Sequence, residues 1–295
     1  MTRGVFVSGV VAAGVLAGVV MATGARAVGA TALPTTPLIE TAQASQDWCR
    51  ETERYNDRDA QFCEVRELKE NASGRLEASV SNGAVAVAAV GNAREVVVRA
   101  RLITQAETMD DARAIAKEVT ISLNNGRLEA TGPRSSWSSG WRSGNRRSWH
   151  VSYRAEVPAR YDLNLDAANG AISVEGVNGA LELETANGSM TLVDLGGRVR
   201  ARTSNGSVSV KVGGSRWDGE GLSVTTANGS ARLELPSSYN AELSVGTNNG
   251  SLTLDIPVTV TGELGRRRNI DTTLGSGGPR LEVRTSNGSL RVGRR

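Results

Sequence analysis

The chain has 295 residues, and its formal net charge at pH 7 is only +3. Glycine is abundant, at 34 residues, whereas aromatic residues make up 4% of the chain, so the core must be built from Val, Leu, Ile and Ala. Acidic and basic side chains are mixed along the chain, which argues against dedicated nucleic-acid binding. Two cysteines and one histidine fall short of a four-ligand zinc set, so we expect no metal and no cofactor.

The N-terminus has the pattern of a secretory signal peptide, which we assign to residues 1–27. Arg3 precedes an apolar run from Val5 to Val20, and Ala25-Arg26-Ala27 matches a cleavage site. The apolar run is shorter than the roughly 20 residues that a membrane-spanning helix needs. An uncleaved anchor is the alternative. We therefore expect an exported protein, periplasmic or on the cell surface, with no transmembrane segment after cleavage.

The exported part divides by composition into a linker, residues 28–46, an N-terminal β-rich part, residues 47–158, and a repeat region, residues 159–295. In an oxidising compartment Cys49 and Cys63 are expected to form a disulfide, in a charged segment that caps the strands. One short helix is predicted from Thr108 to Val119. Thr108 is its N-cap, and its apolar stripe, expected to pack on the sheet, consists of Met109, Ala112, Ile115, Ala116 and Val119.

The repeat region carries a five-residue block, Thr-x-Asn-Gly-Ser, flanked by strands with alternating apolar residues. A related Asn-Gly turn at Asn82-Gly83 joins two strand patterns in the β-rich part. The repeat corners are Asn169, Gly170, Asn187, Gly188, Asn205, Gly206, Asn228, Gly229, Asn249, Gly250, Asn287 and Gly288. Asn and Gly suit such corners because they tolerate positive φ, which we expect at Asn187 and Asn205.

The spacing of these corners predicts the fold class, an all-β solenoid of stacked two-strand coils. Asn169, Asn187 and Asn205 are 18 residues apart, and a second glycine turn lies midway in each interval. Loops are expected at 215–221 and around 262–278, where the spacing loosens. The alternative is an antiparallel meander, because Asn-Gly is also the preferred hairpin turn.

Several segments together resemble a family of exported bacterial proteins, DUF4097-like adhesin candidates with β-strand repeats. They are Asp47-Trp48-Cys49, the strand around Cys63, the helix after Ile103, Gly132-Pro133, the strand from Trp149 to Pro158 and the repeat blocks. The resemblance covers nearly the whole mature chain. It implies a β-solenoid in the cell envelope and brings no established activity.

No residue pattern indicates an enzyme, and we assign no catalytic residues. His150 alternates with Trp149 and Val151 and is expected on the surface, and no Gly-x-Ser-x-Gly elbow is present. Outward carboxylates such as Asp162 and Asp166 are what any solvated strand face predicts. The corners also lack the Asp that calcium-binding β-rolls use. We therefore expect a non-catalytic adhesin or surface scaffold. The alternative is a polysaccharide-active hydrolase or lyase on a similar scaffold.

The segment from Arg134 to Arg147 is the best candidate for contact with a ligand. It gathers two Trp and several Arg in a chain otherwise poor in rings; the candidate residues are Trp137, Trp141, Arg142, Arg146 and Arg147. Such side chains stack on sugar rings and pair with anionic groups. The expected partner is an envelope polysaccharide or another surface protein. The alternative is an insertion whose Trp residues fold back over the solenoid.

Overall fold

The structure is a computed structural model that describes residues 48–49, 60–134, 147–256 and 269–295. These residues belong to one compact unit, Pro37–Arg295. The predicted signal peptide, the linker and four candidate ligand contacts (Trp137, Trp141, Arg142 and Arg146) lie outside the described residues. No helix within the described ranges is long and apolar enough to cross a membrane.

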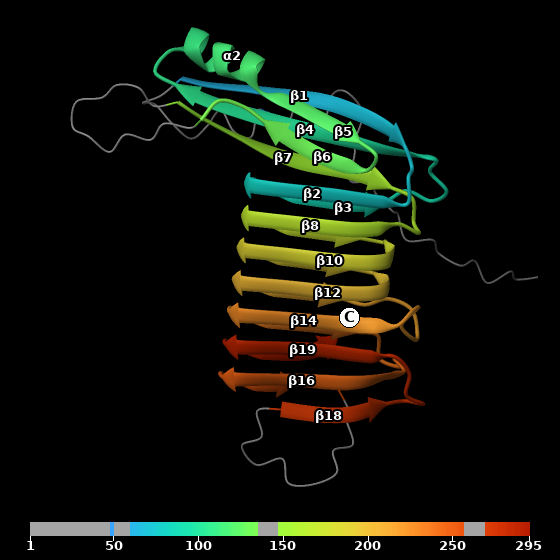
Figure 1. Ribbon diagram of the computed structural model, residues 1–295. Helices are drawn as coiled ribbons and strands as arrows, with labels where there is room; N and C mark the ends of the chain where they lie inside the picture. Colours follow the sequence, from blue (N-terminus) through green and yellow to red (C-terminus); the bar gives the residue numbers. More distant parts are fainter. Residues whose placement is uncertain (1–47, 50–59, 135–146, 257–268) are drawn as a thin grey trace, which may run out of the picture. The chain divides into compact units, whose positions relative to one another are not determined.

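Two ten-stranded sheets make up most of the described chain (Figure 1). Sheet A contains, in spatial order, β1 (Ala60–Asn71), β4 (Glu95–Ala106), β7 (Ser148–Val157), β3 (Val85–Ala89), β9 (Ile172–Glu175), β11 (Met190–Val193), β13 (Val208–Lys211), β15 (Ala231–Leu235), β20 (Leu290–Arg294) and β17 (Leu252–Leu254). Sheet B contains β18 (Asn269–Leu274), β16 (Ala241–Asn249), β19 (Arg280–Asn287), β14 (Gly221–Asn228), β12 (Gly196–Asn205), β10 (Asn178–Asn187), β8 (Asp162–Asn169), β2 (Arg75–Asn82), β6 (Arg127–Thr131) and β5 (Thr120–Asn124).

Each 18-residue repeat forms one coil, with a long strand in sheet B and a short strand in sheet A. Successive coils pair in parallel and in register, so that Leu181 lies beside Val199 in sheet B and Met190 beside Val208 in sheet A. Within β10, Leu181 and Leu183 are buried between the sheets while Glu182 is exposed. The parallel register confirms the predicted solenoid and excludes the hairpin meander.

The coils do not follow chain order at either end of the stack. The coil β2/β3 pairs with β8/β9, although β4 to β7 intervene in the sequence. The sheets therefore run without a break across the proposed boundary between residues 158 and 159. At the other end the last coil, β19/β20, lies between β14/β15 and β16/β17, and β18 adds antiparallel to β16. The spacing of the corners predicted inserted loops but not this order.

The predicted helix is present as α2 (Met109–Glu118), one residue inside the expected bounds at each end. The Thr108 side chain accepts a hydrogen bond from the Asp111 N–H at 3.1 Å, as an N-cap does. Ala112, Ile115 and Ala116 are buried against the sheet. Met109, expected in the same stripe, does not join them and is 40% exposed.

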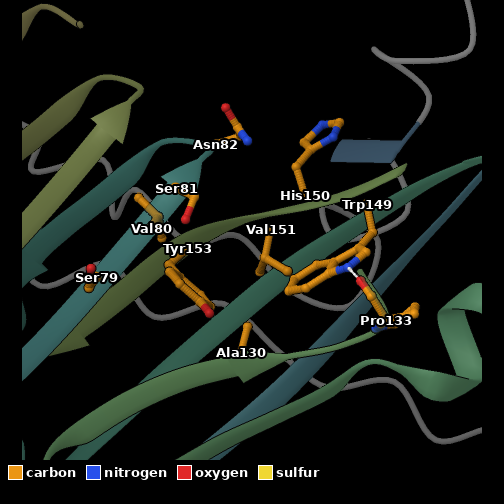
Figure 2. Close-up of a pocket in the computed structure, with 10 residues that line it drawn as sticks. All are labelled: Ser79, Val80, Ser81, Asn82, Ala130, Pro133, Trp149, His150, Val151 and Tyr153. Atoms are coloured by element: carbon orange, nitrogen blue, oxygen red, sulfur yellow. Dashed lines mark hydrogen bonds between the residues drawn. The ribbon is translucent and has the colours of Figure 1, made fainter. Parts of the chain in front are cut away.

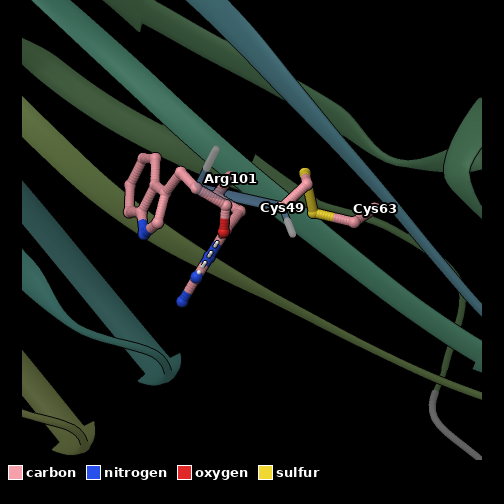
Figure 3. The surroundings of a disulfide bond; sticks show 4 residues. Cys49, Cys63 and Arg101 are labelled. Atoms are coloured by element: carbon pink, nitrogen blue, oxygen red, sulfur yellow. Dashed lines mark hydrogen bonds between the residues drawn. A yellow bond between two sulfur atoms is a disulfide. The ribbon is translucent and has the colours of Figure 1, made fainter. Parts of the chain in front are cut away.

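The predicted disulfide joins Cys49 to Cys63 on β1 (Figure 3). Next to it, the ring of Trp48 is only 7% exposed. The guanidinium groups of Arg101 and Arg154 lie 4.7 and 4.1 Å from this ring. The Arg101 Nη1 also donates to the Trp48 carbonyl at 3.0 Å. The disulfide thus holds Trp48 where two arginines of sheet A contact its ring.

Candidate functional site

The Asn residues of the corners form a continuous chain of side-chain hydrogen bonds along one edge of the stack, the asparagine ladder. The Nδ2 of Asn187 donates to Asn169 Oδ1 at 3.0 Å, and Asn205 donates to Asn187 at 2.9 Å. The same bond repeats from Asn249 to Asn287, Asn287 to Asn228, Asn228 to Asn205 and Asn169 to Asn82. Every amide therefore donates toward the coil β2/β3.

The Thr of each block is buried and bonds to the neighbouring coil. Thr185 Oγ1 donates to the Gly170 carbonyl at 3.0 Å, and Thr203 Oγ1 to the Gly188 carbonyl at 3.1 Å. Thr226, Thr247 and Thr285 make equivalent bonds. Three positions of the repeated block, Thr, Asn and Gly, thus serve contacts between coils.

The expectation of positive φ at Asn187 and Asn205 is wrong. The described residues other than glycine include only Asn125 and Asp194 with positive φ. Glycine is required at Gly206 for a different reason, since a Cβ there would lie 1.9 Å from the Gly188 carbonyl oxygen. Left-handed backbone occurs instead at the opposite corners, as at Gly197, whose φ is +81°.

A cavity opens where the solenoid meets the β-rich part. The register of β2 with β6 covers only Glu77 and Ala78, so β2 continues to Asn82 without a partner on that side. The gap leads to a cavity of about 250 Å³ (Figure 2). Its lining consists of Ser79, Val80, Ser81, Asn82, Ala130, Pro133, Trp149, His150, Val151 and Tyr153.

The aromatic residues of this cavity come from β7. The Trp149 indole N–H donates to the Pro133 carbonyl at 2.8 Å, which fixes the ring. Tyr153 is 1% exposed, and its hydroxyl has no hydrogen-bond partner among the described residues. Burial raises the pKa of this tyrosine to about 12. Figure 2 shows the hydroxyl directed toward Ala130.

His150, expected on the surface, is half-buried at the rim of the same cavity. Figure 2 shows its ring and that of Trp149 projecting in different directions from β7. Burial, and secondly the positive charge of Arg101, lower the pKa of His150 below its usual value. Both effects favour the neutral imidazole.

The candidate ligand-contact segment begins and ends beside this cavity. Pro133 and Trp149, which line the cavity, flank the segment from Arg134 to Arg147. Of the candidate contacts, Arg147 lies among the described residues, and its guanidinium is 3.6 Å from the Glu118 carboxylate at the end of α2. The sequence pointed to this segment through its Trp and Arg residues. No sequence pattern indicated that Tyr153 and Asn82 belong to this site, because only the pairing of their strands brings them there.

Two of the outward carboxylates, Asp162 and Glu182, have structural partners. Asp162 Oδ1 accepts the Ala180 N–H at 2.8 Å. Glu182 lies 3.6 Å from the Arg200 guanidinium on the next coil, a contact typical of a solvated face. Within the described ranges no cluster of three or more His, Cys, Asp or Glu residues is placed to hold a metal ion.

Comparison with known proteins identifies the family. The chain is similar to crystal structures of a proposed cell adhesion protein from Clostridium sporogenes (12% identity, TM-score 0.41, 79% of this chain and 100% of that one) and a proposed adhesin from Bacteroides fragilis (9% identity, TM-score 0.39, 79% and 97%). At these scores the likenesses carry no argument about function. No curated protein matches the chain. The family described as Toastrack DUF4097 matches residues 66–293, most of the chain, and the chain belongs to this family.

Proposed function

We propose that this protein is an exported, non-catalytic, adhesin-like scaffold of the cell envelope that binds a polysaccharide or a surface protein. Its binding region is the cavity at β7 together with the segment from Arg134 to Arg147. The observation that carries the proposal is that one open cavity is lined by the Trp149 ring and by Tyr153, whose buried hydroxyl has no described partner. Clefts that combine aromatic surface with a few unmet polar groups are typical of ligand sites.

Location in an oxidising compartment is supported by the disulfide between Cys49 and Cys63. Such bonds persist outside the cytoplasm and are rare within it. The signal-peptide pattern of residues 1–27 is consistent with the same compartment. We therefore place the protein in the periplasm or on the cell surface.

The alternative, a polysaccharide hydrolase or lyase, is less well supported. Such an enzyme needs two carboxylates that flank one bond. Among the described residues that line the cavity at β7 there is no carboxylate. Asp162 and Asp218 do share a second hollow, but Asp162 binds a backbone N–H and Asp218 accepts from the Asn178 amide at 2.6 Å. These bonds give both carboxylates a structural role.

The double variant Trp137→Ala with Trp141→Ala tests the proposed function. We expect it to abolish binding of the purified protein to cell-wall or polysaccharide preparations while the thermal transition stays in place, because rings that serve to stack on sugars do not support the core. Pull-down and calorimetry measure both quantities. The control is Ser138→Ala with Ser143→Ala in the same segment, which should bind normally. If the double Trp variant binds as before and only its melting temperature falls, the two rings are structural.

A further inference from the structure

The asparagine ladder ends at the cavity of β7. Because every amide donates toward the coil β2/β3, Asn82 accepts from Asn169 at 3.1 Å and donates to no described residue. Hydrogen bonds in such a chain polarise one another, which strengthens the donor at its end. Figure 2 shows the side-chain nitrogen of Asn82 on the side of the cavity that carries His150. The rim therefore presents a polarised amide donor.

The remaining groups define the chemistry that the cavity accepts. Tyr153 contributes a buried hydroxyl that has no described partner, and Ser79 and Ser81 are exposed on β2. Trp149 contributes an apolar ring surface. Asp, Glu, Lys and Arg are all absent from its ten described lining residues. None of these ten residues offers a charged ligand an ionic partner in return for its lost hydration, which is unfavourable.

We infer that this cavity binds one uncharged sugar ring, a neutral hexose or an N-acetylhexosamine unit of a glycan. A pyranose has an apolar face that packs on an indole and hydroxyls that suit an amide, a phenol and serines. The cavity of about 250 Å³ suits one ring rather than a longer oligosaccharide. This inference rests on the proposed function, which it narrows to a ligand class.

An extended peptide added to the free edge of β2 is the competing occupant. Beyond its last partner on β6, β2 offers only Ser79–Asn82. A peptide strand would bind the backbone of this short edge and leave the Tyr153 hydroxyl without a partner. The sugar uses the side chains that the cavity presents, so the observations favour it.

Titration of the full chain, followed by the indole N–H resonance of Trp149 in NMR spectra, tests the inference. The probes are the methyl glycosides of glucose, N-acetylglucosamine and glucuronic acid. We expect at least one of the two neutral glycosides to shift this resonance, and the glucuronide to bind at least about tenfold more weakly because its charge is uncompensated.

The variant Tyr153→Phe separates a ligand contact from a structural role. It removes only a hydroxyl that lacks a partner in the free protein, so the melting temperature should not fall. Binding of the neutral glycoside should weaken about three- to tenfold, the effect of one lost hydrogen bond. Tyr239→Phe is the matched control, because Tyr239 also has a buried, unpartnered hydroxyl, in a different hollow. That variant should bind the glycoside normally.

Three outcomes would overturn the inference. If the chain binds envelope polymer but no glycoside moves Trp149, the ligand class is wrong and the proposed function stands. If an unstructured peptide shifts Trp149 and the glycosides do not, the cavity is a strand-addition site. If Tyr153→Phe and Tyr239→Phe weaken glycoside binding equally, the cavity at β7 is not the binding site.

Discussion

At the corners of the solenoid, one backbone oxygen of the adjacent coil determines which residue fits. The carbonyl oxygen of each corner glycine lies where the next corner glycine would carry its Cβ, as for Gly188 and Gly206. The neighbour is backbone, fixed by strand pairing on both sides, and cannot move away without breaking the register. The selection for glycine at this position is therefore steric and comes from the adjacent coil.

Gly206→Ala should destabilise the protein by roughly 1–3 kcal/mol or more, the usual effect of overpacking a rigid site. Gly293→Ala is the matched control, because a Cβ there meets no atom within 4 Å and its backbone has no positive φ. Its effect should stay within about 0.5 kcal/mol. Urea unfolding of both variants measures the difference. Equal unfolding midpoints would contradict the steric explanation.

Asn-Gly pairs could be located from the sequence, but their backbone conformation could not. A dipeptide that tolerates positive φ occurs in hairpins and in solenoid corners alike. The sequence does not show which atoms of the next coil lie beside the corner. The distance between Gly206 and the Gly188 carbonyl exists only once the coils stack. The same limit applies to Tyr153, whose unpartnered hydroxyl depends on where β2 and β6 separate.

Buried threonines hold each coil to the next one, in addition to the backbone hydrogen bonds between paired strands. Thr203→Val keeps the shape of the side chain but leaves the Gly188 carbonyl without its hydroxyl donor. We expect a loss of about 1–3 kcal/mol in the free energy of unfolding. Thr191→Val, on the exposed face of β11, serves as the control and should be nearly neutral. If thermal or urea unfolding shows the same loss of stability for both variants, the hydrogen bond of the Thr203 hydroxyl does not stabilise the protein.

The sequence predicted the coils and the helix α2 to different extents. The 18-residue period determined the parallel coils, since the inward Leu and Val residues recur at equivalent positions. The cap and acidic first turn located α2, but the apolar pattern could not show that Met109 is exposed. Periodicity reports which residues can face a core and not how far that core extends.

In the stack as a whole, the order of the last coils differs from their order in the sequence. The coil β16/β17 is joined to the rest of the solenoid through β19 and β20, which lie between it and β14/β15. The sequence could not reveal this order, because β16 and β19 carry equivalent corner blocks and either could pair with β14. The longer spacing predicted only loops at 215–221 and around 262–278, and the second range in fact contains the strand β18.

Removal of residues 279–295 should leave a slot with unpaired strand edges on both sides. We expect the shortened protein to melt at a lower temperature and to bind a synthetic peptide of residues 279–295, since each strand of that peptide has two parallel partners in the slot. Fluorescence anisotropy of a labelled peptide measures binding, with a scrambled peptide as the control. Failure to bind, combined with an unchanged melting temperature, would contradict the strand order.

The position of β19/β20 also governs when folding can finish. During synthesis the chain appears from its N-terminal end, and β14 and β15 then present open edges until residues 280–294 follow. Open edges recruit strands from other molecules, and pairings between distant segments form slowly. We expect this interval to be the time at which nascent copies are most prone to aggregate and to need a chaperone. Closure by the final coil ends that exposure.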